Sequence, residues 1–222
     1  METDMENDMG FTLPTWALAA VAPFMAKNDV RFYLNSVYVA PVNGPDGAKG
    51  CAVVATDGHA LAVVRLREVN VPGPVLLPRD AVEWAVKAKG DDVAFALAGE
   101  SGKDWTMTAG GASRPVTEID GRFPDWQAVV PEPLADEPAE GAQRLEYVAF
   151  DAALIERVVK SAKVLNKAGI VGGRRTGAYV VPDMRGQRAA CWTCSGYKVE
   201  GVEVTWVLMP LRGGVTPCGV KS

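Results

Sequence analysis

Cysteine and histidine are the first side chains to consider for metal or redox chemistry, and the chain has four cysteines and one histidine. Cys191 and Cys194 have the Cys-x-x-Cys spacing found in zinc sites and in thiol–disulfide pairs. A four-ligand zinc site would need a partner chain, because there is no second such pair. A redox pair would need a helix N-terminus to lower the thiol pKa, whereas this segment has the composition of a strand. Ordinary strand residues are the favoured interpretation, and a thiol or zinc enzyme is the alternative.

Other catalytic arrangements are not evident. The sequence contains no recognisable nucleophile–base pair, paired carboxylates or phosphate-binding glycine loop. Asp57 lies in a predicted turn and Asp29 precedes a predicted strand, so both are explained as loop residues. We therefore expect a protein that is not an enzyme and that uses no metal and no cofactor.

The composition is that of a globular protein with one large domain or two ordinary ones. The chain has 222 residues, of which 48% are hydrophobic and 23% charged. The net charge of −4 argues against general coating of nucleic acid but allows a local basic face. The apolar run at 16–25 is too short to span a bilayer and follows no basic segment. We expect a cytoplasmic protein without a membrane partner.

One pattern occurs three times: a short apolar strand, a residue suited to starting a helix, and a helical run. The starting residues are Pro14, Pro78 and Asp151. The predicted strand–helix pairs are 11–14 with 15–25, 75–78 with 79–89, and 148–151 with 152–165. The strands predicted to follow them are 31–40 and 50–66, then 93–98, 105–109 and 115–119, then 178–181, 189–193 and 202–211. The sequence thus predicts an α+β protein of three strand–helix–strand–strand–strand modules.

Composition also predicts how the modules are joined. Residues 1–10 are acidic and predict a disordered tail, and 213–222 predict a second tail. Residues 132–144 are rich in proline and acidic side chains, which is typical of an extended linker. Two modules at 11–131 and one at 145–212 form the remaining units.

The dipeptide Asp57-Gly58 is flanked by two apolar runs. It favours a two-residue hairpin turn with positive φ at both positions. The upstream segment 30–38 predicts another strand.

The third predicted helix has an apolar stripe and a separate basic face. The stripe consists of Leu154, Ile155, Val158, Val159, Ala162 and Leu165. The basic face consists of Arg157, Lys160, Lys163 and Lys167. Such a face is either simply solvated or lies against a phosphate backbone, and the second helix adds Lys87 to the second possibility.

Four segments, 28–35, 55–59, 120–125 and 207–212, together resemble the bacterial sliding clamp, the β subunit of DNA polymerase III. The similarity extends over 11–212 and is strongest over 28–131. It implies the DNA-clamp fold, in which helices cover one face of antiparallel sheets. It also implies a polymerase processivity factor that encircles double-stranded DNA.

The resemblance further implies a groove that binds short hydrophobic motifs of DNA polymerase and clamp-loader subunits. Matching positions place these residues in the groove: Arg31, Tyr33, Leu34, Thr56, Gly58, His59, Leu61, Pro124, Val129, Val207, Met209, Pro210 and Leu211. Matching positions and basic helix faces give these candidates for DNA binding: Lys27, Asn28, Phe32, Arg79, Lys87, Arg157, Lys160, Lys163 and Lys167.

The chain also departs from the family. The family's first domain has no counterpart, and the third module is about half of its C-terminal domain. Ala60 and Ala128 stand where the family often has arginine. The family ring has twelve modules, so three modules per chain imply a homo-oligomeric ring of four chains, or of three if each mimics a two-domain clamp. The alternative is a clamp-derived adaptor, or competitor of host replication proteins, that forms no ring.

Overall fold

The computed structural model describes residues 10–43, 47–99, 101–130, 150–170, 179–181, 190–195 and 201–209. The predicted linker at 132–144, the tail at 213–222 and nearly all of the tail at 1–10 lie outside these residues. Of the strand predicted at 148–151, the first two residues also lie outside, and Phe150 and Asp151 are described but belong to no strand. The helices are α1 (Thr15–Val21), α2 (Arg79–Lys87) and α3 (Ala152–Lys167), with 3-10 helices η1 (Ala22–Phe24), η2 (Phe32–Leu34) and η3 (Gln127–Val129). The strands are β1 (Phe11–Pro14), β2 (Ser36–Asn43), β3 (Lys49–Thr56), β4 (Ala60–Arg67), β5 (Val75–Pro78), β6 (Asp92–Leu97), β7 (Asp104–Ala109), β8 (Ala112–Thr117), β9 (Tyr179–Val181), β10 (Ala190–Ser195) and β11 (Val202–Leu208).

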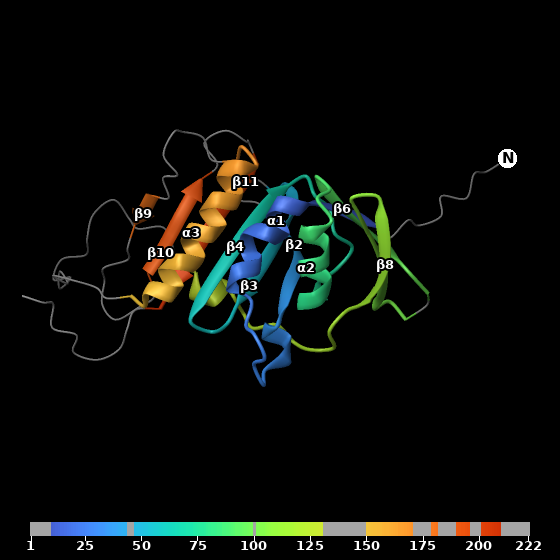
Figure 1. The fold of residues 1–222 in the computed structure, drawn as a ribbon, viewed down its shortest axis with the longest axis horizontal. Coiled ribbons are helices and arrows are strands. Elements are labelled where there is room, and N and C mark those ends of the chain that lie inside the picture. The colour runs from blue at the N-terminus through green and yellow to red at the C-terminus, as the bar shows by residue number, and fades with distance from the viewer. Residues whose placement is uncertain are drawn as a thin grey trace, which may run out of the picture.

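Two antiparallel sheets form the framework, which confirms the predicted α+β class (Figure 1). One sheet has the order β1-β6-β7-β8 and the other β5-β2-β3-β4-β11-β10-β9. The first strand of each of the first two modules pairs with the neighbouring module: Phe11 of β1 lies opposite Phe95 of β6, and Val37 of β2 opposite Leu77 of β5. The modules recur along the chain but are interlocked through these exchanged strands.

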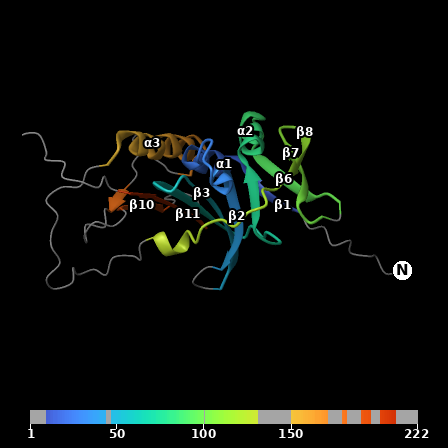
Figure 2. The same ribbon diagram turned by 90° about the horizontal axis from the view of Figure 1, so that it is seen from below.

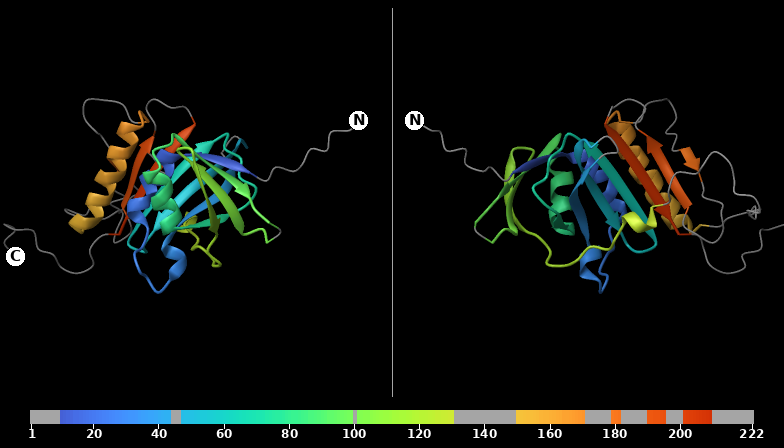
Figure 3. Two further views of the ribbon diagram at one scale, coloured as in Figure 1. Left: turned by 45° about the vertical axis from the view of Figure 1, so that its right-hand side comes forward. Right: turned by 180° about the vertical axis from the view of Figure 1, so that it is seen from behind.

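The third module continues the sheet of the first. Strand β11 pairs with β4, with Val207 opposite Leu61 and Leu208 opposite Ala60. Figure 3 shows the resulting seven-stranded sheet from behind, with β11 and β10 beside β4. Residues almost 150 positions apart in the sequence thus become neighbours.

The three α-helices lie on one face of this sheet, and the segment 119–130 crosses the opposite face (Figure 2). Neighbouring residues of a strand point to opposite faces, so β3 contributes Val53 to the helix side and Val54 to the other, both fully buried. We call these the helix face and the groove face. On the helix face the indole N–H of Trp206 donates to Ser161 Oγ of α3 at 3.0 Å.

The helices begin where the sequence predicts. Pro14 and Pro78 are the extended residues before α1 and α2, and the Asp151 carboxylate caps α3 by accepting from the Ala153 amide at 2.8 Å. The first helix is shorter than the predicted 15–25, because Pro23 has no N–H to continue it and the chain tightens into η1. No helix in the described part of the chain has the length and hydrophobicity needed to cross a membrane.

The prediction of a strand at 30–38 is wrong over its first half. Residues 32–34 form η2, and β2 begins only at Ser36. Asn35 and Asp29 close the preceding loop with two hydrogen bonds, from the Asp29 amide to Asn35 Oδ1 at 3.1 Å and from Asn35 Nδ2 to the Asp29 carbonyl at 2.9 Å. These side-chain bonds favour a turn over the extended backbone that the apolar residues suggest.

Candidate peptide-binding groove

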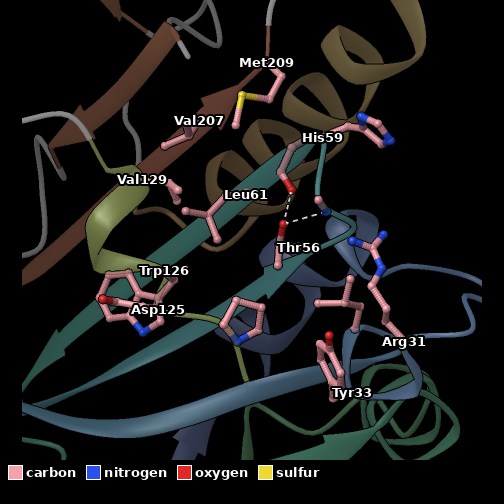
Figure 4. Close-up of a pocket in the computed structure, with 14 residues that line it drawn as sticks. Arg31, Tyr33, Thr56, His59, Leu61, Asp125, Trp126, Val129, Val207 and Met209 are labelled. Carbon is pink, nitrogen blue, oxygen red and sulfur yellow. Dashed lines mark hydrogen bonds between the residues drawn. The ribbon is translucent and has the colours of Figure 1, made fainter. Parts of the chain in front are cut away.

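A groove of about 210 Å³ opens on the groove face, between the β3–β4 loop, the end of β11 and the segment 119–130 (Figure 4). Its walls are mostly apolar. The lining residues are Arg31, Tyr33, Leu34, Thr56, Gly58, His59, Ala60, Leu61, Pro124, Asp125, Trp126, Val129, Val207 and Met209. Eleven of the thirteen predicted groove residues are among them, and Pro210 and Leu211 lie outside the described residues.

Sequence reasoning missed three lining residues, Ala60, Asp125 and Trp126. The aromatic residue in the Phe123-Pro-Asp-Trp126 run was the available signal, because a large apolar side chain in a turn-rich segment often packs onto a neighbouring element. Ala60 was identified only as a position where the family often carries arginine.

The loop between β3 and β4 differs from the predicted two-residue turn. The last paired residues are Thr56 and Leu61, and Gly58 is the only loop residue with positive φ, at 90°. Side-chain hydrogen bonds explain the difference: Asp57 Oδ1 accepts from the amides of His59 at 2.9 Å and Ala60 at 3.0 Å. An aspartate that bonds to its own following amides holds a wider loop than the tight hairpin turn requires.

The floor of the groove is buried and apolar. Leu34, Leu61 and Val207 are each less than 5% exposed, whereas Val129 and Met209 at the opening are 41% and 38% exposed. The Met209 amide donates to the His59 carbonyl at 2.9 Å, which brings the end of β11 against the loop. A floor of this kind suits leucine and aromatic anchors of a peptide.

One rim of the groove carries an arginine that is held in place. Arg31 donates from Nε to Asp29 Oδ1 at 3.0 Å and from Nη2 to Asp29 Oδ2 at 2.8 Å. The side-chain bond and the backbone amide of Arg31 lower the pKa of Asp29 to about 2. Arg31 Nη2 also lies 3.3 Å from the Asp57 carbonyl, so this rim is tied to the loop.

The segment 119–130 is anchored by aromatic side chains. The ring of Phe123 stacks on Tyr38 with centroids 4.8 Å apart, and Trp126 is only 6% exposed. The guanidinium of Arg65 lies 5.4 Å from the centroid of the Trp126 ring and also pairs with Glu203 at 3.5 Å. These contacts fix one wall of the groove against β2 and β4.

The candidates for DNA binding are not brought into one cluster. Lys27, Asn28 and Phe32 are exposed on the loop before β2, where Asn28 has a φ of 57° and Phe32 is 53% exposed. Lys87 is exposed on α2.

Arg79 on α2 is engaged within the fold. Its Nη2 donates to the carbonyls of Met25 at 2.9 Å and Ala26 at 2.6 Å, and its Nη1 pairs with Glu83 at 3.1 Å. These bonds hold the end of η1 against the start of α2.

On the basic face of α3, some residues are paired within the fold and others are not. Arg157 pairs with Asp57 in the β3–β4 loop, and Lys160 pairs with Glu156 one turn away at 3.0 Å. Lys163 and Lys167 are exposed and form no ion pair with any described residue.

The cysteines show no metal cluster within the described residues. Cys191 and Cys194 lie on strand β10, which agrees with the strand interpretation of this segment. Cys51 is fully buried, and burial raises the pKa of its thiol to about 12.

Comparison with known proteins gives one consistent result, although no protein-family model matches the chain. The beta sliding clamp of Caulobacter vibrioides is 32% identical over 114 residues, which is 48% of this chain and 29% of that protein. That of Proteus mirabilis is 30% identical over 135 residues, 58% of this chain and 35% of that protein. The chain therefore matches about a third of the length of these relatives.

Solved structures extend the likeness in fold. Caulobacter crescentus pol III beta superposes with a TM-score of 0.58 at 20% identity, covering 96% of this chain and 68% of that one. The H. pylori beta clamp in complex with diflunisal gives 0.65 at 12% identity, covering 95% and 68%. These findings confirm the predicted DNA-clamp fold. The chain resembles the bacterial beta sliding clamps in both sequence and fold.

Proposed function

We propose that this protein is a clamp-like, non-enzymatic processivity factor that binds replication proteins through the groove on its sheet. The observation that carries the proposal is the groove itself. Residues of the β3–β4 loop, the end of β11 and the segment 119–130 converge on one apolar slot. The similarity to beta sliding clamps supports the same function.

The groove favours weak and exchangeable binding of a short peptide. Burying two apolar anchors, such as leucine and phenylalanine, contributes roughly 3–6 kcal/mol before the costs of association. Those costs leave an affinity on the order of micromolar, which suits partners that must replace one another. The proposed partners are DNA polymerase and clamp-loader subunits that carry such motifs, in the cytoplasm.

The helix face is the proposed DNA side. Several copies of the chain, four or three, would close a ring with the helices of each copy facing double-stranded DNA. Exposed cations such as Lys163 and Lys167 on α3 would face the phosphates without reading the sequence. Binding of this kind weakens steeply as the salt concentration rises.

A second candidate function is a peptide-binding adaptor, or competitor of host replication proteins, that forms no ring. It requires only the groove and no contact between copies of the chain. Retention on DNA separates the two functions: a ring stays on closed circular DNA and slides off linear DNA, whereas an adaptor is retained on neither. Light scattering that shows only a monomer at high concentration would exclude the ring.

Substitution of Met209 tests the groove. Met209→Asp places a charge at the apolar opening, so we expect the affinity for a peptide with leucine and phenylalanine anchors to fall at least tenfold. Val159→Asp is the matched control, because Val159 is 44% exposed on the opposite face. Fluorescence anisotropy measures the affinity, and circular dichroism verifies that both variants fold. Equal affinity of Met209→Asp and the wild-type protein would refute the groove.

A further inference from the structure

We propose that Arg157 is a positioning residue of the groove, although it lies on a helix of the opposite face. It acts through Asp57, the first residue of the β3–β4 loop. This inference rests on the proposed function, because positioning matters only if the groove binds a peptide. The residue itself does not line the groove.

The geometry joins α3 to the loop. Arg157 Nη1 lies 2.5 Å from Asp57 Oδ2, and the two residues are 100 positions apart in the sequence. The other carboxylate oxygen, Oδ1, accepts the amides of His59 and Ala60. One oxygen is therefore held by the helix while the other holds the loop, so the orientation of the carboxylate fixes the backbone of two groove residues.

The remaining bonds to residues 57–59 come from the groove itself. Among the described residues, these bonds are made by Arg31, Thr56, Ala60 and Met209, all of which line it. A peptide entering the groove contacts these residues and can disturb their bonds. Arg157 supplies the tie that a bound peptide does not touch.

Burial distinguishes this ion pair from the pair between Lys160 and Glu156 on the same helix. The side chains of Arg157 and Asp57 are 27% and 14% exposed, whereas those of Lys160 and Glu156 are 56% and 62% exposed. A shielded pair with three charge-assisted bonds on one carboxylate orients its groups more strongly than a solvated pair does. Lys160 is thus a matched control on the same helix.

A double-mutant cycle on peptide affinity tests the proposal. We expect Arg157→Met and Asp57→Asn each to weaken binding of the leucine–phenylalanine peptide roughly tenfold, because the pair acts as one unit. The double variant should then be no weaker than the worse single variant, and Arg157→Lys should recover part of the affinity. Lys160→Met should leave the affinity unchanged. Additive losses in the double variant would overturn the proposal.

A measurement without peptide separates this inference from the proposed function. Hydrogen exchange of the His59 and Ala60 amides reports the bonds to Asp57 Oδ1 directly. We expect Arg157→Met to accelerate their exchange relative to the core of β3, and Lys160→Met not to do so. If the wild-type protein binds no peptide, the proposed function fails while the exchange rates still decide the positioning role.

If Arg157→Met lowers the melting temperature but changes neither exchange nor affinity, the residue is only structural and the inference is wrong. Should Arg157→Met not fold, Arg157→Lys carries both measurements.

Discussion

Both faces of the seven-stranded sheet have buried apolar residues, but the two faces are covered in different ways. Three helices cover the helix face, and its core includes residues from all three modules. On the groove face the cover is the segment 119–130 with η3, together with the turn at 26–34, and its core cluster is smaller. Trp206 and Val207, neighbours on β11, show the contrast: Trp206 is enclosed beneath α3, whereas Val207 forms part of the groove floor.

This comparison teaches where a binding site can arise in a protein with two buried sheet faces. Helices complete the helix face, so its apolar residues have their partners within the chain. The segment 119–130 completes the groove face only in part, and the uncovered remainder is the groove. An apolar surface left beside a fixed wall is suited to a partner that brings its own apolar side chains.

The largest effect is expected on the helix face. Trp206→Ala removes a fully buried indole and leaves Ser161 Oγ without its donor. The free energy of unfolding should fall by about 3–5 kcal/mol, as measured by urea denaturation. Ser161→Ala, which removes only the hydrogen bond, should cost about 1 kcal/mol. A loss below that of Ser161→Ala would show that the helix face is not tightly packed.

The same substitution on the groove face should cost less. Trp126 lies in the segment 119–130, which can collapse and admit water when the side chain is removed. We therefore expect Trp126→Ala to lower the free energy of unfolding by about 1–3 kcal/mol in the same urea denaturation. Peptide affinity should fall as well, because Trp126 lines the groove. If Trp126→Ala is as destabilising as Trp206→Ala, the two faces do not differ in the way described.

Substitution of Arg79 tests whether this candidate for DNA binding on the helix face instead stabilises the fold. Arg79→Met removes donors to the Met25 and Ala26 carbonyls, so we expect the free energy of unfolding to fall by about 1–2 kcal/mol. Lys87→Met on the same helix should change it by less than about 0.5 kcal/mol. Chemical denaturation measures both. If Arg79→Met has the stability of the wild-type protein, the structural role is wrong and Arg79 is again a candidate for DNA binding.

The smallest effect concerns pH. Burial alone would raise the pKa of Asp57, but the bonds from the His59 amide, Arg157 and the Ala60 amide outweigh it and lower the pKa overall. The folded state therefore favours the carboxylate, and its stabilisation is present above the unfolded pKa of about 4 and is lost as pH falls through the folded value. The difference in unfolding free energy between wild type and Asp57→Asn, about 1 kcal/mol at pH 7, should shrink below pH 4. Denaturation at pH 7, 5, 4 and 3 measures this, and a difference independent of pH would contradict it.

Local signals were enough to predict much of the fold. Pro14, Pro78 and Asp151 start helices through their own backbone and side-chain chemistry, so the three helices appear where expected. The exchange of β1 and β5 between modules could not be predicted, because it depends on pairing across long separations. The strand prediction was wrong for the first half of the segment 30–38, because hydrogen bonds between Asp29 and Asn35 outweigh its apolar pattern.

The site was less accessible to sequence reasoning. The predicted groove residues came from the resemblance, since nothing in their spacing alone indicates a groove. Trp126 was missed because no local pattern says which neighbour it contacts. The pairing of Arg157 with Asp57 depends on how β11 and α3 dock beside β4, which only the assembled sheet reveals.

The exchanged strands also bear on synthesis at the ribosome. Phe11 of β1 has its partner Phe95 about 80 residues further along. At roughly 5–20 residues per second, that partner emerges several seconds after β1 does. During this interval Phe11 and Leu13 lack the β6 partners that they have in the folded protein, so the first sheet cannot close until the second module has been made.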